Sequence, residues 1–364
     1  MIFPFGPLSE GAVSEADWGC VEGRSLDDID CLLRRRNKMK LSILGTGKIV
    51  HDALDALKEV PDIEITSVFA RPKSRAKAEA LAKEWNIPQV WTDYAQLLAE
   101  DAADFVYVGL VNTVHYEYAK QALEAGKNVI IEKPFAPTYE EVKELIDLAA
   151  AKHCMILEAV TLLYLPNFHA MQDALAQLGP IRAVQANYSQ YSSRYDKYLA
   201  GTVLPAFDPA MAGGALYDIN IYNLNLICGL FGVPVSGTYT ANRGFNGVDT
   251  SGVAVLRYPH FFATAVGAKD SASRCFAVVQ GERGWMELEG APNELPRVTL
   301  HADGKDCVVE SNRYENRMVS EFQSFAKIFA EGDWEAVRRS NEQSLCVAKQ
   351  VDELRRSAGL QAVH

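Results

Sequence analysis

Lys133 is the first side chain in this sequence whose position suggests chemistry. It follows the apolar segment 128–132 and precedes Pro134. An ammonium group at the end of a buried strand can exchange a proton or stabilise an oxygen that gains negative charge during a reaction. The same lysine could simply leave the strand for solvent, so its position alone does not establish a site.

Asp218 and Tyr222 form a second candidate pair, in the segment GGALYDINIYNLN. On a helix, residues four apart share a face, and Asn225 would continue that face. The alternation of polar and apolar residues across the segment indicates a strand equally well. A structural helix with a buried tyrosine is the alternative without function.

A glycine turn follows the first apolar segment of the chain. Gly45 and Gly47 stand where a strand would pass into a helix, and backbone NH groups at such a point suit a pyrophosphate. Val50 occupies the place of the usual third glycine. The turn predicts a dinucleotide site made by five consecutive residues: Gly45, Thr46, Gly47, Lys48 and Ile49.

The end of the second apolar segment bears on the choice of dinucleotide. An NAD site usually has an acidic residue there, whereas this chain has Arg71, Lys73 and Arg75. Guanidinium groups suit a 2′-phosphate, and cations are otherwise disfavoured at the start of a helix. The pattern favours NADP(H) over NAD(H), with solvated surface charges as the alternative.

Alternating strand and helix patterns surround these residues in the first half of the chain. Apolar segments at 40–44, 63–69, 104–110, 128–133 and 155–160 are separated by helical patterns, one of which begins with the capping box Thr138–Glu141. This alternation predicts an α/β protein with an N-terminal Rossmann, doubly wound parallel sheet.

The second half shows a different pattern. After Pro180, alternating segments and Asn-Gly turns predict a C-terminal α+β domain with a large, open, mostly antiparallel sheet. Helices are expected over 317–332 and 342–359. The expected domains are an N-terminal extension at 1–38, a Rossmann dinucleotide-binding domain at 39–160, and a substrate-binding and dimerisation domain at 161–364.

The extension differs from the rest in composition, and Met39 is the natural start of the domain that follows. Residues 25–33 could form one short amphipathic helix, with Leu26, Ile29 and Leu33 on one face. We expect no function there.

The composition limits the classes of partner. A net charge of −11 argues against nucleic acids and acidic membrane surfaces. No apolar run approaches the length of a membrane span. Seven scattered cysteines indicate reduced thiols in a cytoplasmic protein, and neither cysteines nor histidines show the spacing of metal ligands.

Taken together, the glycine turn, Asn112-x-x-His115, ALEAGKNVIIEKP and GGALYDINIY resemble the Gfo/Idh/MocA oxidoreductase family. The segments ARPKSR and EAVTLLYLP are most similar to its branch of dimeric dihydrodiol dehydrogenases and NADP-dependent xylose dehydrogenases. In that branch two arginines at the spacing of Arg71 and Arg75 hold the 2′-phosphate.

The resemblance also implies roles for single residues. Lys133 would point at the reacting oxygen of the substrate, and the Lys133–Pro134 bond would be cis. Independently of the resemblance, partial desolvation is expected to lower the pKa of Lys133. Asp218 and Tyr222 would bind the substrate hydroxyl. The remaining expected cofactor residues are Asn112 and His115 beside the nicotinamide ribose, Glu132 near the nicotinamide, and Glu158 at the cofactor side of the cleft.

The resemblance implies an NADP(H)-dependent enzyme that transfers hydride to or from a CH–OH or hemiacetal carbon of a sugar, cyclitol or dihydrodiol. A homodimer through the C-terminal sheet is expected. A non-catalytic NADP-binding redox sensor is the alternative. Thr161 and Leu163 depart from the residues of the dihydrodiol branch, which leaves the substrate open.

Overall fold

The computed structural model describes residues 38–361, so the expectations for residues 1–37 lie outside the described part of the chain. Within 38–361, no helix is long and apolar enough to cross a membrane. The same residues contain no group of three His, Cys, Asp or Glu side chains that could hold a metal ion.

The first half of the chain forms a six-stranded parallel sheet in the order β3-β2-β1-β4-β5-β6. Its strands are β1 (Met39–Leu44), β2 (Ile63–Phe69), β3 (Gln89–Trp91), β4 (Phe105–Val108), β5 (Asn128–Glu132) and β6 (Ile156–Ala159). The short edge strand β3 was not predicted, because three residues carry too little periodic signal. The doubly wound sheet itself is confirmed.

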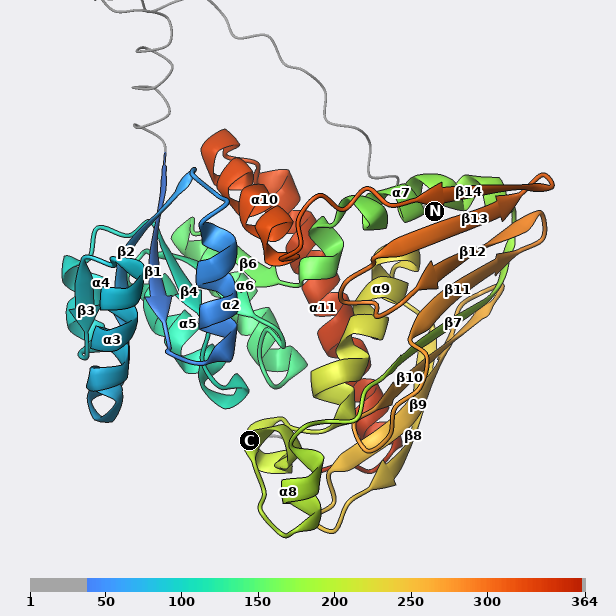
Figure 1. Ribbon diagram of the computed structural model, residues 1–364, viewed down its shortest axis with the longest axis horizontal. Helices are drawn as coiled ribbons and strands as arrows, with labels where there is room; N and C mark the ends of the chain where they lie inside the picture. The colour runs from blue at the N-terminus through green and yellow to red at the C-terminus, as the bar shows by residue number, and fades with distance from the viewer. Residues whose placement is uncertain (1–37, 362–364) are drawn as a thin grey trace, which may run out of the picture.

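Helices cover both faces of this sheet. They are α2 (Lys48–Leu57), α3 (Arg75–Trp85), α4 (Tyr94–Glu100), α5 (His115–Glu124) and α6 (Tyr139–Lys152), joined by α10 (Met318–Glu331) from the end of the chain. Phe322 and Phe325 of α10 belong to the core under α2 and β1, and Figure 1 shows α10 beside α2. The predicted capping box is present, with Thr138 and Glu141 each accepting a hydrogen bond from the other's backbone NH.

The second sheet has eight strands in the order β14-β13-β12-β11-β7-β10-β9-β8. They are β7 (Ile181–Ser189), β8 (Ser236–Arg243), β9 (Asp249–Arg257), β10 (Phe262–Ala268), β11 (Phe276–Gly281), β12 (Gly284–Glu289), β13 (Arg297–Ala302) and β14 (Lys305–Val309). All neighbours are antiparallel except β7 and β10. The predicted open, mostly antiparallel sheet is confirmed.

Two helices connect the sheets. The helix α9 (Ile221–Phe231) and the long helix α11 (Trp334–Ser357) lie between the sheets, and α11 contacts β6, α6, α9 and β8. The shorter helices α7 (Pro166–Ala174) and α8 (Tyr195–Leu199) lie at opposite ends of the large sheet. In Figure 1 the other face of that sheet carries no helix of the described chain.

Candidate active site

The glycine turn connects β1 to α2 at the carboxyl end of the parallel sheet. Gly45 has φ +114°, and a Cβ there would lie 2.5 Å from the carbonyl oxygen of Gly109, so only glycine fits. Around Gly47 a Cβ would meet nothing within 4 Å. The N-terminus of α2 has no side-chain cap and no acidic residue in its first turn. This opening and these unpaired NH groups fit a dinucleotide pyrophosphate.

The missing third glycine is compensated elsewhere in the chain. Val50 is fully buried, and a Cβ on Gly109 would lie 2.9 Å from its Cγ2 atom. A glycine at the end of β4 therefore provides the space that a glycine in the turn would otherwise provide. Val50 is thus accommodated without a third glycine in the turn.

The other residues of the turn are open to solvent. Lys48 is exposed and forms an ion pair with Asp52 at 2.6 Å, while Thr46 and Ile49 are half-buried. The amide of Gly45 donates to the carbonyl oxygen of Phe69 at 2.9 Å, which connects the turn to the end of β2.

The predicted 2′-phosphate residues follow directly after β2. Arg71 and Arg75 are both exposed on either side of the 3₁₀ turn Pro72–Ser74. Arg75 pairs with Glu79 at 2.8 Å, and within residues 38–361 no ion-pair partner is found for Arg71. Cations are unfavourable at the positive N-terminal end of a helix dipole, and the first turn of α3 contains no acidic residue to offset that effect.

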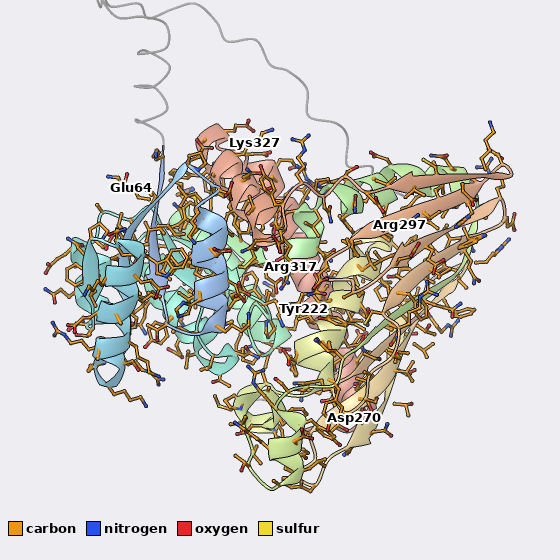
Figure 2. The ribbon with its side chains drawn as sticks, viewed as in Figure 1. Glu64, Tyr222, Asp270, Arg297, Arg317 and Lys327 are labelled. Atoms are coloured by element: carbon orange, nitrogen blue, oxygen red, sulfur yellow. The ribbon has the colours of Figure 1, made fainter. Side chains whose placement is uncertain are left out.

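Lys133, Asp218 and Tyr222 come together, although 85 residues separate the lysine from the aspartate. The Lys133 Nζ atom donates to the main-chain oxygen of Asp218 at 3.0 Å and lies 3.4 Å from its Oδ1 atom. The same atom lies 4.7 Å from the centre of the Tyr222 ring. The Lys133–Pro134 bond is cis. Figure 2 shows Tyr222 in the space between the two sheets.

The expected lowering of the Lys133 pKa is wrong for this arrangement. Burial disfavours the ammonium form, but the Tyr222 hydroxyl and the nearby carboxylates outweigh burial and raise the pKa of Lys133. Burial opposes ionisation of Asp218 as well, yet two adjacent lysines lower the pKa of its carboxyl group below the usual range. At neutral pH the site therefore holds an ammonium group and a carboxylate.

A π-helix at Leu216–Asn220 carries Asp218 and continues directly into α9. The segment is thus a helix and not a strand, but its wide first turn was not predicted. The amide of Leu216 donates to Asp249 at 2.7 Å, which fixes the start of the segment. Asn225 does not continue the polar face, because it is buried and bonds to the carbonyl oxygen of Ile221.

Lys269 is a residue that the sequence reasoning missed. It follows β10 and is 2% exposed, and its Nζ atom lies 2.7 Å from Asp218 Oδ2. Its position resembles that of Lys133, since both lysines directly follow an apolar strand. A lysine directly after an apolar strand was therefore the sequence pattern that could have identified Lys269.

Two other predicted residues lie beneath the surface of the site. Glu132 is 6% exposed and accepts a hydrogen bond from the Tyr107 hydroxyl at 2.6 Å. His115 is fully buried, with its ring nitrogens 2.9 Å from the Pro134 oxygen and 3.1 Å from the Leu110 oxygen. Burial lowers the pKa of His115. Glu132 also accepts a hydrogen bond from the Lys133 amide at 3.3 Å, so both side chains bond to the backbone around Lys133.

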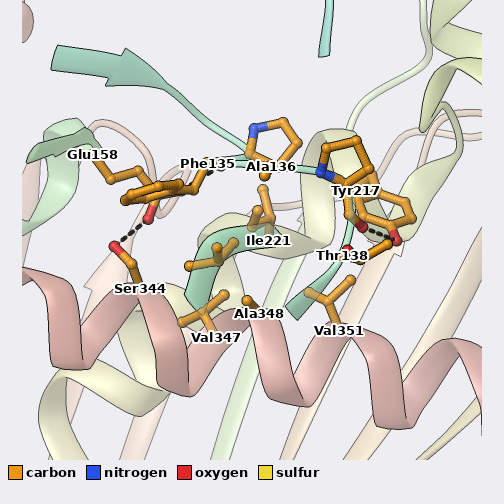
Figure 3. A pocket seen from close by; sticks show the side chains of 13 residues that line it. Phe135, Ala136, Thr138, Glu158, Tyr217, Ile221, Ser344, Val347, Ala348 and Val351 are labelled. Carbon is orange, nitrogen blue, oxygen red and sulfur yellow. Dashed lines mark hydrogen bonds between the residues drawn. The ribbon is translucent and has the colours of Figure 1, made fainter. Parts of the chain in front are cut away.

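Glu158 connects this backbone to α11. Its carboxylate accepts hydrogen bonds from the Phe135 amide at 2.9 Å and the Ser344 hydroxyl at 2.6 Å. Burial raises the pKa of Glu158 to about 7. Figure 3 shows it beside a cavity of about 20 Å³ under the segment 134–138, which is room for about one water molecule.

Asn112 links the two halves of the chain. Its side-chain amide donates to the carbonyl oxygen of Ala212 at 3.3 Å, from the turn after β4 to the segment before the π-helix. Asn112 is half-buried.

Sequence and structure comparisons agree with this architecture. Residues 39–160 match the model of an oxidoreductase family with an NAD-binding Rossmann fold, and residues 168–287 match a Gfo/Idh/MocA C-terminal domain. The solved structure of a 3-ketoreductase from Actinomadura kijaniata with NADP and TDP-benzene superposes with a TM-score of 0.77 at 22% identity, over 88% of this chain and 98% of that chain. At that identity the likeness concerns the fold.

Several curated relatives are closer in sequence. An NADP⁺-dependent scyllo-inositol 2-dehydrogenase of Bacillus subtilis is 32% identical over 88% of this chain and 98% of its own length. An NADP⁺-dependent D-xylose 1-dehydrogenase of Haloferax volcanii is 28% identical, with 88% and 97% covered. A trans-1,2-dihydrobenzene-1,2-diol dehydrogenase of Bos taurus is 30% identical, with 69% and 74% covered.

All of these relatives are named as dehydrogenases, and none supports the alternative of a non-catalytic sensor. The two matched domains, the glycine turn and the identity over nearly the whole inositol dehydrogenase lead to one conclusion. The chain belongs to the Gfo/Idh/MocA family of oxidoreductases with an NAD(P)-binding Rossmann domain.

Proposed function

We propose that this oxidoreductase prefers NADP(H) and interconverts a secondary alcohol or hemiacetal and the corresponding carbonyl in a sugar, cyclitol or dihydrodiol. The observation that carries the proposal is the position of Lys133 Nζ against Asp218 and the Tyr222 ring. This cluster lies at the carboxyl edge of the sheet that also carries the glycine turn, where open α/β sheets bind their ligands. The relatives' substrates support the substrate class.

The cofactor would be held by residues of the first half of the chain. The backbone of the turn 45–49 binds the pyrophosphate, and Arg71 with Arg75 binds the 2′-phosphate. Asn112 borders the nicotinamide side. We assign Glu132, His115 and Glu158 to the support of the Lys133 backbone, because their polar atoms already bond to protein groups.

Bound NADP(H) would supply or accept the hydride. The protein handles the accompanying proton and charge. The Lys133 ammonium donates a proton to the carbonyl oxygen during reduction and must receive it back during oxidation. Its positive charge also stabilises the developing alkoxide. Tyr222 is the second proton carrier, and the Asp218 carboxylate orients both Lys133 and the substrate hydroxyl.

The variant Lys133→Met tests the proposal. We expect kcat/KM to fall about 10³-fold with NADP⁺ and scyllo-inositol, D-xylose or a dihydrodiol, because a general acid–base group is lost. The Kd for NADPH should change less than about threefold, since the 2′-phosphate and pyrophosphate contacts remain. Lys127→Met is the control, because Lys127 binds only main-chain oxygens in the structure. Undiminished turnover in Lys133→Met would refute the assignment.

We further propose that the domains divide at about residue 160 and that two copies associate through the open face of the large sheet. Side chains on that face alternate with core residues, and four large apolar ones are 38–49% exposed: Val255, Phe262, Trp285 and Val308. Large exposed apolar side chains on a sheet face that no helix covers support an interface there. Residues 39–160 would bind the cofactor and residues 161–364 the substrate and the second copy.

Sedimentation velocity tests the dimer. The wild type should sediment with the mass of two chains, and Phe262→Glu with Trp285→Glu should shift it to one. Val233→Glu is the control, because Val233 is 58% exposed but precedes β8 outside the strands. A monomeric wild type would refute the dimer.

A further inference from the structure

Lys269 lies in the interior, at the carboxylate oxygen of Asp218 that Lys133 does not contact. Its Nζ atom contacts Asp218 Oδ2 at 2.7 Å and the carbonyl oxygen of Ala206 at 2.5 Å, and it lies 4.4 Å from the centre of the Phe207 ring. Its side chain is 3% exposed, whereas that of Asp218 is 40% exposed. Lys269 therefore offers almost no surface to solvent or to a substrate.

The two carboxylate oxygens of Asp218 are shared between two lysines. Oδ1 faces Lys133 at 3.4 Å and Oδ2 faces Lys269 at 2.7 Å. A carboxylate held on both sides can neither rotate nor readily take up a proton. The shorter contact belongs to the buried lysine, so Lys269 fixes the carboxylate and Lys133 contacts its second oxygen.

The cluster of Lys133, Asp218 and Lys269 carries a net positive charge. Two ammonium groups face one carboxylate, so one positive charge is left beside the proposed reacting oxygen. Besides Asp218 and Lys133, Asp249 acts on Lys269, and its carboxylate accepts hydrogen bonds from the Leu216 amide at 2.7 Å and the Tyr239 hydroxyl at 2.9 Å. Burial raises the pKa of Asp249 to about 6, so its negative charge is lost as the pH falls through about 6.

We propose that Lys269 is a positioning residue for the reaction: it holds Asp218 in place and, as a second buried positive charge, eases the loss of the proton from Lys133. The inference rests on the proposed function of Lys133 and Asp218. Removal of a nearby positive charge makes the ammonium form of Lys133 more favourable. Alcohol oxidation, which requires Lys133 without its proton, should then begin at a higher pH.

The experiment compares wild type, Lys269→Met, Lys269→Gln and Lys269→Arg. For NADP⁺ with scyllo-inositol, D-xylose and a dihydrodiol, we expect Lys269→Met to lower kcat/KM at pH 7 by 10- to 100-fold and to displace the rising limb of the pH profile upward by about one pH unit. Lys269→Arg, which keeps the charge, should return the limb toward that of wild type. NADPH affinity confirms that each variant folds, and Lys269→Gln replaces Lys269→Met if the latter does not.

A readout without turnover separates this inference from the proposed function. In thermal unfolding, Lys269→Met and Asp218→Asn should be non-additive, with the double variant shifting Tm by less than the sum of the single shifts. Additive shifts, or a lower plateau with an unmoved pH limb, would overturn the inference. If wild type turns over none of the three substrates, the proposed function fails, and the Tm cycle alone decides whether Lys269 positions Asp218.

Discussion

At the glycine turn the chain presents exposed groups with few partners, whereas at Lys133 it presents groups that are already bonded. Gly47 and Lys48 are exposed, and the NH groups at the start of α2 have no side-chain cap. Lys133 and Lys269, in contrast, are 17% and 3% exposed in their side chains and share one carboxylate. The glycine turn is therefore open for a ligand, whereas the cluster of Lys133, Asp218 and Lys269 is fixed before a ligand binds.

The two regions also differ in how the chain builds them. Five consecutive residues make the turn, and the arginines follow one neighbouring strand. The lysine–aspartate cluster combines the ends of β5 and β10 with a π-helix, from residues as far apart as 133 and 269. We therefore expect a mutation in the turn to affect only its neighbours in the chain, and a mutation in the lysine–aspartate cluster to affect all three segments that form it.

The buried side of this comparison is probed most strongly by Glu158→Gln. The pKa of Glu158 is raised by burial to about 7, so the folded state keeps this proton to a higher pH than the unfolded state. The wild type should lose stability relative to the variant as pH rises from about 4.5 to about 7, by about 3 kcal/mol for a pKa rise of roughly 2.5 units.

Urea unfolding of both proteins at pH 4.5, 6 and 8 measures this difference. Glutamine keeps an oxygen that can accept the hydrogen bond from the Phe135 amide. The pH dependence of the difference therefore reports on the ionisation of Glu158 and not on the loss of that hydrogen bond. A stability difference that does not change with pH would mean that burial does not raise the pKa of Glu158.

The open side is probed by the double variant Arg71→Ala/Arg75→Ala. Loss of two charge-assisted contacts to a 2′-phosphate should weaken NADPH binding about 100-fold and leave NADH binding unchanged. Calorimetric titration with both cofactors gives the two Kd values. Lys77→Ala, on the exposed face of α3, is the matched control. Equal losses for NADPH and NADH would contradict the 2′-phosphate assignment.

Asp218→Asn tests whether the lysine cluster is prearranged. Lys269, buried at 3% exposure, would lose its counter-ion, which should lower the free energy of unfolding by about 2 kcal/mol. The expected loss is below that of a fully buried pair, because the Asp218 side chain remains 40% exposed. Urea unfolding at pH 7 measures it, and an unchanged midpoint would show that the cluster does not contribute to the fold.

Lys48→Ala gives the matching value for the open region. The Lys48–Asp52 pair is 81% and 42% exposed in its side chains, so its loss should change the free energy of unfolding by less than about 0.5 kcal/mol. The same urea titration compares it directly with Asp218→Asn. Similar losses for the two variants would remove the distinction between the regions.

Much of the fold follows from sequence patterns because those patterns are local. Strand and helix alternation predicted the parallel sheet, and the capping box at Thr138 marked the start of α6 correctly. The alternating segments after Pro180 predicted the strands of the large sheet. The three-residue strand β3 and the parallel pairing of β7 with β10 were missed, because neither short length nor pairing partner is written in local periodicity.

Local patterns identify Gly45 and Gly47 by their spacing and Lys133 by its place after an apolar strand. The surroundings of these residues depend on the folded chain. It showed Gly109 making room for Val50, Lys269 holding Asp218, and a pKa of Lys133 that is raised instead of lowered. The physical reason is that burial, charge pairing and close packing depend on distances between segments remote in the chain, and local patterns do not encode those distances.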